Sequence, residues 1–342
     1  MEETKQFLTG AEVVVQACRD AGATSMYGYP ITPGTEILSG WIRRAQGEKG
    51  LQYLQTEDEI AAGFAVCGAV IAGVKAFTAT AGPGTVLMQD SLSMAEGMRL
   101  PVVVIDVQRG GPSSGTVIYS QQEVNLAIHG GNGEGQRIVY SPGNLSELYK
   151  HTRLAFNYAW QYRFPAIVLS DGFVMKTRQL VDWYWSEENV SPTPLISPDT
   201  QKNIRNIYTF EEELNAEIEK NQKDFELMGK KIQEAEENSE VGADILLVAH
   251  GLVAQAALVA AQMLRSQGKK ISVWRPITLS PFPADSLNVA AEKHQKIVVV
   301  ESSLGQLTAL IKNSLRVGRE VETILRPALG IEPEEIIKRL NV

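Results

Sequence analysis

Four short segments of this 342-residue chain combine rigid turns with side chains that could hold a small ligand. In the first, GYPITPGTEI, Pro30 and Pro33 fix two backbone angles around Thr32. A rigid turn that presents one hydroxyl suits a carbonyl or carboxylate oxygen, although the spacing alone favours an ordinary proline-rich connection. Pro30 and Thr32 are therefore the first candidates for ligand contact.

The second segment, QTEDEIAAGFAVCGAVIAG, places Glu57, Asp58 and Glu59 at the start of a predicted helix of small residues. Acidic residues are common at a helix start because they complement its positive end. The alanines and glycines that follow would let a backbone or a flat ring approach closely. A carboxylate held there would lose water, which raises its pKa and lets it share a proton with a ring nitrogen.

The third and fourth segments are TAGPG and VVVIDVQRGGPSSG. Gly82, Pro83 and Gly84 connect a predicted strand to a helix, and glycines there permit close approach to a ligand, although GPG is more often only a turn. Arg109 directly follows a strand and could bind a carboxylate through two parallel hydrogen bonds, with a structural ion pair as the alternative. No Lys-Ser or Lys-Thr follows the glycines after Arg109, which excludes a phosphate-binding P-loop.

Each of these segments follows a predicted strand, where open parallel sheets place their ligand sites. Helical and β-branched stretches alternate through the first half of the chain, a pattern typical of a parallel α/β sheet. Thr9 and Glu12 have capping-box spacing, and Gly22 can close the first helix in a left-handed conformation. We expect buried strands at SMYGY, LQYLQT, VKAFTAT, PVVVIDV and FPAIVLS, and helices at about 9–21, 34–46, 58–73, 85–98 and 144–161.

The chain is predicted to form two doubly wound α/β domains, the first over about residues 1–175. From 176 to 242 prolines mark an extended crossing, and residues 209–240 are rich in charge. Such a run is typical of a solvated helix face and less often of a docking arm, so we treat 176–242 as a linker with a charged helix. A second domain over 243–342 is expected from strands at ADILLVAHG, KKISVWRP and QKIVVVES and helices near 252–267 and 283–293.

The composition argues against several classes of protein. A net charge of -8 disfavours nucleic acid as a partner, because binding to phosphates draws on clustered Lys and Arg. No apolar run approaches the roughly 20 residues that cross a bilayer, and MEETKQFLTG lacks the regions of a signal peptide, so we expect a cytoplasmic protein without a membrane partner. Cys18 and Cys67 are too few for an iron–sulfur cluster, and we expect buried free thiols and no metal site on this chain.

Taken in order, YPITP, the acidic residues before the small-residue helix, TAGPG with LMQDSLSMAEG, and DVQRGGPSSG resemble the alpha subunit of 2-oxoacid:ferredoxin oxidoreductases, which depend on thiamine diphosphate. The resemblance covers most of the first domain and resumes in WRPITLSPFP, residues 274–283. It implies that the two domains are similar to the pyrimidine-binding and C-terminal domains of transketolase-like enzymes.

The resemblance also implies which residue acts on the cofactor. In that family one glutamate hydrogen-bonds the aminopyrimidine ring of thiamine diphosphate, and thiamine enzymes place a glycine nine positions later. Gly68 lies nine positions after Glu59 but eleven after Glu57. Glu59 is therefore the expected catalytic and cofactor-binding residue.

The remaining roles follow from the same resemblance. Thr32 and Arg109 are expected to bind the carboxylate of the 2-oxoacid. The segment HGGNGEG departs from the family pattern, so no role is assigned to Asn132 or to His129, for which an exposed loop histidine is the expected state. The residues expected to line the pocket for the cofactor are Pro30, Gly82, Pro83 and Gly84.

The implied reaction is the oxidative decarboxylation of a 2-oxoacid with coenzyme A, which gives acyl-CoA and carbon dioxide and passes electrons to ferredoxin. This sequence lacks both a GDG-type motif for Mg²⁺ and the diphosphate and a set of cluster cysteines. A beta subunit is therefore expected to bring Mg²⁺ and an iron–sulfur cluster and to share the thiamine diphosphate at the subunit interface. Gamma and ferredoxin-like delta subunits are further partners in some family members.

Two other interpretations stay open at this point. The chain could be the pyrimidine-side subunit of a lipoamide-linked 2-oxoacid dehydrogenase or a transketolase relative, since these share the architecture. It could also be a scaffold subunit that has lost the chemistry, although Thr32, Glu59 and Arg109 occur together. The form RPITLSPFP favours 2-oxoisovalerate-like or 2-oxoglutarate substrates over pyruvate.

Overall fold

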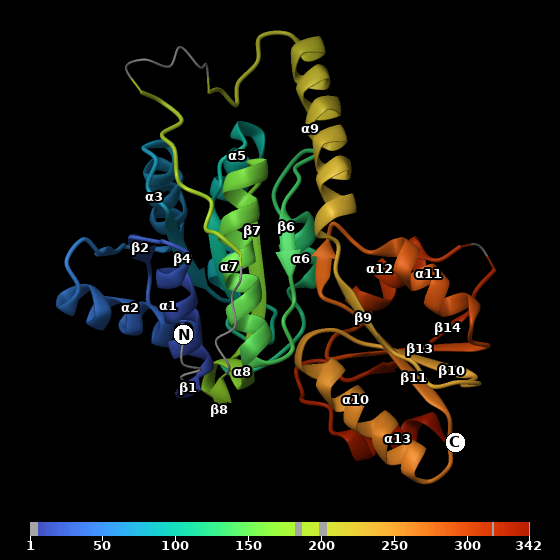
Figure 1. The fold of residues 1–342 in the computed structure, drawn as a ribbon. Coiled ribbons are helices and arrows are strands. Elements are labelled where there is room, and N and C mark those ends of the chain that lie inside the picture. Colours follow the sequence, from blue (N-terminus) through green and yellow to red (C-terminus); the bar gives the residue numbers. More distant parts are fainter. Residues whose placement is uncertain (1–5, 182–186, 198–203, 317, 342) are drawn as a thin grey trace.

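The larger of the two main sheets carries the segments singled out above (Figure 1). The structure is a computed structural model that describes residues 6–181, 187–197, 204–316 and 318–341. Within these residues the sheet has the order β12-β6-β7-β5-β4-β2-β3, and only β12 runs antiparallel to its neighbour. Its strands are β2 (Ser25–Gly28), β3 (Gln52–Gln55), β4 (Ala76–Thr80), β5 (Val103–Gln108), β6 (Ile138–Tyr140), β7 (Ala166–Asp171) and β12 (Thr278–Ser280).

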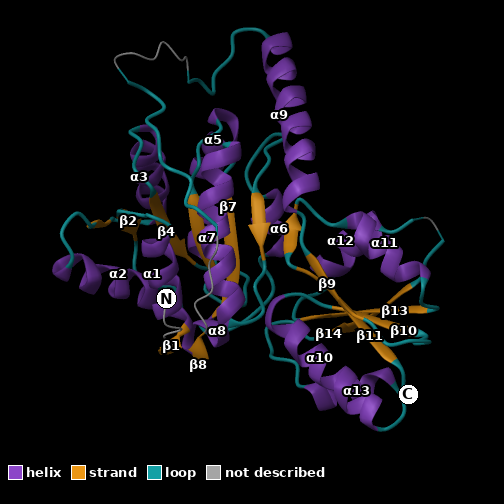
Figure 2. Cartoon of the chain, viewed as in Figure 1, coloured by secondary structure: helices purple, strands orange, loops and turns teal. Residues whose placement is uncertain are grey.

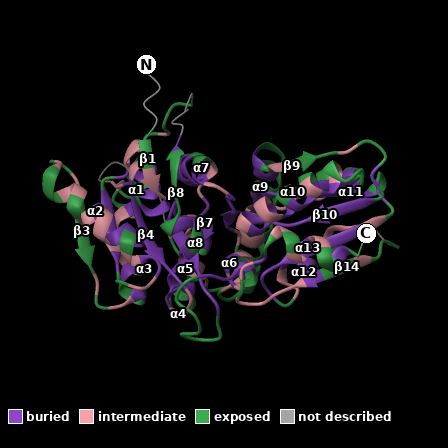
Figure 3. Cartoon of the chain, turned by 90° about the horizontal axis from the view of Figure 1, so that it is seen from below, coloured by how far each residue is buried: buried purple, intermediate pink, exposed green. Residues whose placement is uncertain are grey.

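Helices cover both faces of this sheet (Figure 3). Alternate residues of β5 point to opposite sides, so that Val103 and Ile105 pack in one core cluster and Val102 and Val104 in the other. The first cluster includes residues of α1, α2, α7 and α8, and the second includes residues of α3, α5 and α6. These helices and the short α4 are α1 (Gly10–Asp20), α2 (Thr35–Gly47), α3 (Glu59–Ile71), α4 (Pro83–Leu87), α5 (Gln89–Met98), α6 (Val124–His129), α7 (Leu145–Tyr162) and α8 (Gly172–Lys176).

The start of α1 shows how local sequence determines these elements. The Glu12 backbone N–H donates to the Thr9 hydroxyl at 3.2 Å, and the Glu12 carboxylate accepts the Thr9 N–H at 2.8 Å. This is the predicted capping box. Gly22, with a φ of +85°, follows the last turn in the left-handed conformation, so the predicted helix end is also confirmed.

The second main sheet is built from the C-terminal part of the chain (Figure 2). Its order is β14-β13-β10-β11-β9, and β9 is antiparallel to β11. α10 and α13 pack on one face, and α11 and α12 pack on the other. The elements are β9 (Ala235–Asn238), β10 (Ile245–Val248), α10 (Gly251–Ser266), β11 (Ile271–Pro276), α11 (Ala284–Glu292), β13 (Lys296–Glu301), α12 (Gln306–Ser314), β14 (Val321–Leu325) and α13 (Pro333–Leu340).

The charged segment forms one helix, α9 (Glu211–Ile232), which rises beside the larger sheet in Figure 1. Its first turns are exposed, as expected for a solvated face, but Phe225 and Met228 near its end are buried. The Phe225 ring contacts Phe164 edge-on at 5.1 Å between centroids. The end of the charged segment therefore packs into the core of the larger sheet.

Several contacts join the two main sheets. The Arg275 guanidinium of β11 binds both carboxylate oxygens of Glu147 on α7, at 2.5 and 2.9 Å. The Gln121 side-chain amide donates to the His250 carbonyl at 2.8 Å. β12 adds a strand from residues 278–280 to the larger sheet, whereas β9 adds one from residues 235–238 to the smaller.

The structure confirms the predicted α/β class and most of the predicted elements, and it also contains elements that were not predicted, among them β6, α6, α12, β14 and α13. Three further differences concern the larger sheet and the N-terminus. β3 was expected to be buried, but all four of its residues are exposed because it lies at the edge of the sheet. The expected helix at 85–98 is divided at Met88 into α4 and α5, and α4 already begins at Pro83. A small two-stranded sheet of β1 (Gln6–Thr9) and β8 (Arg178–Val181) was not anticipated.

No helix within the described residues is both long and apolar enough to span a membrane. The division of the chain into residues 1–175, 176–242 and 243–342 stays a prediction.

Candidate functional site

The carboxyl ends of β2, β3, β4 and β5 lie at one edge of the larger sheet, as parallel strands require. Contacts between the loops show how closely they approach. Gly84 packs against Glu59, Gly82 packs against Arg109, and the Arg109 side chain contacts the Thr32 backbone. The four candidate segments are therefore brought together.

Glu59 is the first residue of α3, directly after the helix cap. The Asp58 carboxylate accepts the Ala61 N–H at 2.7 Å and so fixes the start of the helix. Glu59 itself is buried, with 5% of its surface exposed. Loss of water raises the pKa of the Glu59 carboxyl, and the negative charge of the neighbouring Asp58 raises it further. The Glu59 backbone N–H and the positive charge of Arg109 act in the opposite direction, but the net effect is a raised pKa.

The Gly82–Gly84 segment packs directly against this carboxyl group. A Cβ on Gly84 would lie 2.6 Å from Glu59 Oε1 and 2.3 Å from the Thr80 hydroxyl, so the residue at this position has to be glycine. Gly82, with a φ of +51°, caps the N-terminus of α4, and a Cβ there would lie 2.8 Å from Arg109 Nε. The segment that the sequence suggested was a turn is thus the start of α4, and it packs between Glu59 and Arg109.

Arg109 lies one residue beyond the end of β5 and is buried. Its Nη1 donates to the backbone carbonyl of Thr32 at 2.7 Å. Among the described residues its Nε has no hydrogen-bond partner, and no carboxylate forms an ion pair with it. Thr32 therefore meets Arg109 through its carbonyl oxygen, whereas the sequence argument had relied on its hydroxyl.

Pro30 is the candidate that the structure connects least to the others. It is exposed, and it lies on the loop between β2 and Thr32. Gly68 is also exposed, and a Cβ there would meet no atom within 4 Å. The structure thus brings Glu59, Gly82, Gly84 and Arg109 together, with the Thr32 backbone beside them.

Two buried carboxyl groups at this site were not among the sequence candidates. Glu123 precedes α6, and its carboxylate accepts the Gly82 N–H at 2.9 Å and the Arg109 N–H at 2.9 Å. Asp106, in the middle of β5, accepts the Thr85 hydroxyl at 3.0 Å. An acidic residue inside the apolar run VVVIDV was the available signal for Asp106, but no local pattern distinguished Glu123.

A cavity of about 620 Å³ opens beside Arg109. Apolar residues make up much of its lining, and the guanidinium is the one positive charge among its described lining residues. The lining residues are Gly82, Pro83, Val86, Leu87, Arg109, Gly111, Pro112, Ser113, Gln122, Glu123, Leu126 and Gln306.

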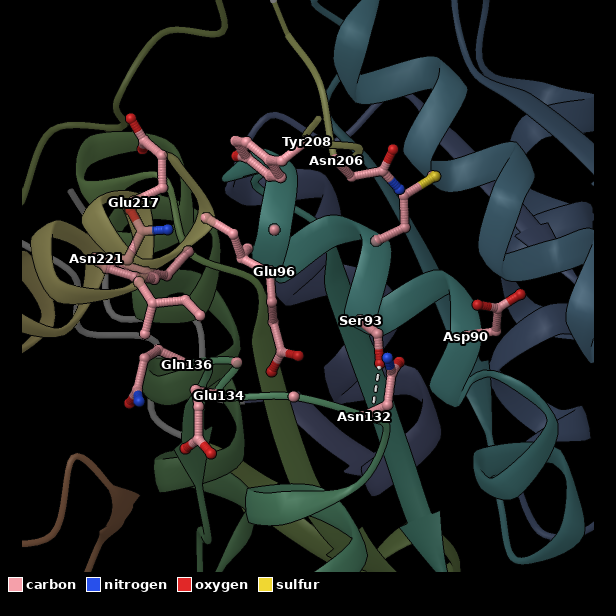
Figure 4. Close-up of a pocket in the computed structure, with 17 residues that line it drawn as sticks. Asp90, Ser93, Glu96, Asn132, Glu134, Gln136, Asn206, Tyr208, Glu217 and Asn221 are labelled. Atoms are coloured by element: carbon pink, nitrogen blue, oxygen red, sulfur yellow. Dashed lines mark hydrogen bonds between the residues drawn. The ribbon is translucent and has the colours of Figure 1, made fainter. Parts of the chain in front are cut away.

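A second cavity, of about 360 Å³, lies between α5, α9 and the 132–136 loop (Figure 4). Glu96, Glu134 and Glu217 line it, and the Asn132 N–H donates to the Ser93 hydroxyl at 3.2 Å. It contains none of the predicted site residues. His129 is exposed as expected, but it ends α6 and is not part of a loop.

No group of three or more His, Cys, Asp or Glu side chains within the described residues could hold a metal ion. Cys18 and Cys67 are both buried free thiols, as predicted. Burial raises the pKa of the Cys67 thiol to about 12.

The chain matches two families of known proteins. Residues 16–245 match the family described as pyruvate flavodoxin/ferredoxin oxidoreductase, thiamine diP-binding. Residues 243–332 match pyruvate:ferredoxin oxidoreductase core domain II. Together these matches extend over nearly the whole chain.

Individual relatives agree with the family matches. The 2-oxoglutarate synthase subunit KorA of Methanothermobacter marburgensis is 31% identical, over 98% of each chain. The ketoisovalerate oxidoreductase subunit VorB of the same organism is 32% identical over 98% of this chain and 97% of that protein.

Two solved structures are also similar. The 2-oxoglutarate:ferredoxin oxidoreductase from Magnetococcus marinus superposes with a TM-score of 0.86 at 28% identity, over 99% of this chain and 65% of that one. That structure holds 2-oxoglutarate, coenzyme A and succinyl-CoA. A split-gene transketolase, at 15% identity and a TM-score of 0.58 over 98% of this chain and 93% of that one, shares the fold.

Proposed function

Because the chain belongs to the pyruvate flavodoxin/ferredoxin oxidoreductase family, we propose that it is the alpha subunit of a 2-oxoacid:ferredoxin oxidoreductase. The enzyme decarboxylates a 2-oxoacid oxidatively, forms acyl-CoA from coenzyme A and reduces ferredoxin. The observation that carries this proposal is a buried glutamate and a buried arginine whose Nε has no partner among the described residues, both at one edge of a sheet, in a chain that matches the family over nearly its full length. The matches confirm the predicted family and favour it over the lipoamide-linked and scaffold alternatives.

Thiamine diphosphate fits the residues at this edge. The Glu59 carboxyl is shielded from water and has a raised pKa, which suits a group that shares a proton with a ring nitrogen. Gly84 leaves no side chain in front of that carboxyl. When bound, the cofactor supplies the carbanion that attacks the 2-oxo carbon and takes up the electrons of the broken bond.

Glu59 is the catalytic residue of this chain. Its carboxyl group holds a proton against the pyrimidine nitrogen, and its burial keeps that proton from exchanging freely with solvent. Gly82, Pro83 and Gly84 would form the rim of the pocket for the ring, and Pro30 stiffens the loop that leads to Thr32. The close contact of Gly84 with Glu59 Oε1 supports this arrangement.

Arg109 binds the carboxylate of the 2-oxoacid together with Thr32. The Nε of Arg109 has no partner among the described residues, and a buried guanidinium with an unpaired donor favours an anionic ligand. The contact from Nη1 to the Thr32 carbonyl fixes the guanidinium plane. The substrate carboxylate therefore lies beside the apolar cavity, into which its side chain can extend.

The active enzyme requires at least one further subunit. The relatives are themselves named as subunits, and this chain offers no cluster cysteines. A beta subunit brings Mg²⁺, the iron–sulfur cluster and the residues for the diphosphate, and it covers Glu59 at the interface. Exposed apolar side chains beside the site support such a partner, namely Ile60, Val86, Leu87, Val117 and Ile118.

The test is to purify the chain with the subunits encoded beside it and to measure reduction of ferredoxin or viologen. The assay contains thiamine diphosphate, coenzyme A and a panel of 2-oxoacids that includes 2-oxoglutarate, 2-oxoisovalerate and pyruvate. Reduction that requires both coenzyme A and one 2-oxoacid is expected, together with iron in the purified complex. A complex without iron that reduces no acceptor with any 2-oxoacid would contradict the proposal.

A further inference from the structure

Two acidic side chains, Asp106 and Glu123, face each other beneath the candidate site without an intervening cation. Asp106 is completely buried, and Glu123 has 5% of its surface exposed. The two carboxyl groups lie within hydrogen-bonding reach of each other. Two negative charges in such a dry position repel strongly and have lost the water that would stabilise them.

The donors around the pair are distributed unequally. Glu123 accepts the backbone N–H groups of Gly82 and Arg109, and the positive charge of Arg109 lies close to it. Asp106 accepts a single hydrogen bond, from the Thr85 hydroxyl to Oδ1. Its Oδ2 is buried and receives no hydrogen bond from any donor among the described residues.

A proton on Asp106 Oδ2 would give this buried oxygen a hydrogen bond, because Oδ2 then donates to Glu123. Both carboxyl oxygens of Asp106 would then have a partner. We propose that Asp106 and Glu123 form a one-proton carboxyl pair, with the proton on Asp106 and the charge on Glu123, that holds the Gly82 turn and Arg109 in register for the substrate. Asp106 and Glu123 are thus positioning residues, and neither touches the reacting atoms. The positioning role rests on the proposed function, whereas the shared proton does not.

The charges around the pair agree with this assignment. Burial and the Glu123 charge raise the pKa of Asp106 well above its ordinary value. The groups that face the pair are Arg109, at the end of β5, and the neutral Thr85 hydroxyl of α4, while the neighbouring strands place Thr80 and Leu169 in register with Asp106. The one cation lies beside Glu123, which is where the negative charge is stabilised.

The first test uses the full-length chain alone at pH 8, with infrared spectra of the wild type and of Asp106→Asn. The wild type should show the band of a protonated carboxyl group, and the difference spectrum should assign it to Asp106. Asp171, whose pKa burial raises to about 6, is mostly ionised at pH 8 and does not interfere. Identical spectra in this region would overturn the proposal.

Thermal stability gives a second readout. A carboxyl group with a raised pKa in the folded protein costs stability as the pH rises above its unfolded value of about 3.9, because the unfolded chain then releases the proton that the folded chain retains. Asp106→Asn carries an amide in place of the protonated carboxyl and lacks this cost. Its Tm should exceed that of the wild type, by a margin that widens from pH 5 to pH 8; a variant that melts below the wild type at pH 8 would contradict a neutral Asp106.

Activity of the assembled complex tests the positioning role. Asp106→Asn should keep kcat/KM within about threefold of the wild type, because the amide can still donate to Glu123. Glu123→Gln should lower kcat/KM by roughly tenfold or more, mainly through KM, because it loses a charged acceptor for two N–H groups. Equal losses in both variants would refute the assignment, whereas a wild-type complex inactive with every 2-oxoacid would refute the proposed function and leave the infrared and melting results decisive for the proton.

Discussion

Two buried arginines of this chain, Arg137 and Arg109, have opposite environments. Every nitrogen of the Arg137 guanidinium has a partner: Nε binds Glu96 at 2.5 Å, Nη1 the Gln89 side chain at 3.0 Å and Nη2 the Gly130 carbonyl at 2.6 Å. Among the described residues the Arg109 guanidinium has one hydrogen bond, to the Thr32 carbonyl, and its Nε is unpartnered. Both side chains are almost fully buried, so exposure does not explain the difference.

The comparison teaches how a structural cation can be distinguished from one that is available for a ligand. Burying a charge is costly unless it is paired, and Arg137 meets that cost within the chain. Arg109 does not, although Glu123 lies close enough to accept its backbone N–H. The fold therefore leaves a hydrogen-bond donor of Arg109 without a partner among the described residues, and a bound carboxylate could accept from it.

The largest effect is expected from Glu59→Gln, which leaves Arg109 in place but removes the proton carrier beside it. Activity of the assembled complex should fall by about 10²–10⁴-fold, the usual contribution of a general acid or base. The Tm of the isolated chain should not fall, because the raised pKa of Glu59 means that its charge is unfavourable in the folded state. Wild-type activity in this variant would exclude Glu59 as the catalytic residue.

Glu96→Gln should instead remove the ion pair between Glu96 and Arg137. Removing the carboxylate leaves a buried guanidinium without a counter-charge, which should cost about 3 kcal/mol of unfolding free energy. Denaturant unfolding of the isolated chain measures this loss, with Glu134→Gln, an exposed glutamate of the same cavity, as the matched control. A loss equal to that of the control would show that the Arg137 ion pair is not structural.

Arg109→Met tests the other arginine of the comparison. Because Arg109 forms no direct ion pair among the described residues and its charge only lies near Glu123, the stability of the chain should change little. The KM for the 2-oxoacid should rise by about 100-fold, as expected when one partner of a desolvated charge pair is removed. Steady-state kinetics with saturating coenzyme A gives this value, and an unchanged KM would rule out the carboxylate-binding role.

The smallest effect is expected from Gly84→Ala, which adds one methyl group next to the Glu59 carboxyl. The new Cβ would overlap Glu59 Oε1 and the Thr80 hydroxyl, so one of them must move at a cost of about 1–3 kcal/mol. Gly97→Ala on α5 is the control, because its Cβ would meet only Asn206, at 3.7 Å. Activity should fall in the first variant and not in the second; equal activities would mean that Glu59 does not need its present position.

The sequence was most informative about elements whose signals are local. The Thr9 cap, the buried apolar run VVVIDV and the position of Glu59 at the start of a small-residue helix each lie within a few residues, and the structure has them as expected. The resemblance to a family then linked segments that are distant along the chain.

The rest depended on contacts between distant residues. The exposure of β3 follows from its place at the sheet edge, which its own sequence does not indicate. The packing of Phe225, near the end of α9, depends on Phe164, 61 positions earlier. Glu123 gains its importance only because the fold brings two N–H groups from other loops to its carboxylate.

The antiparallel strand β12 has a consequence for how the protein is made. Thr278 pairs with Tyr140, 138 positions earlier in the chain, and so covers the outer side of β6. While the ribosome is still extending the chain, the N–H and C=O groups of β6 have no covering strand and could pair with a neighbouring nascent polypeptide. A shortened protein that stops before β12 would keep this vulnerable surface permanently, and its tendency to aggregate would reflect the missing strand, whatever the intrinsic stability of the helices around it.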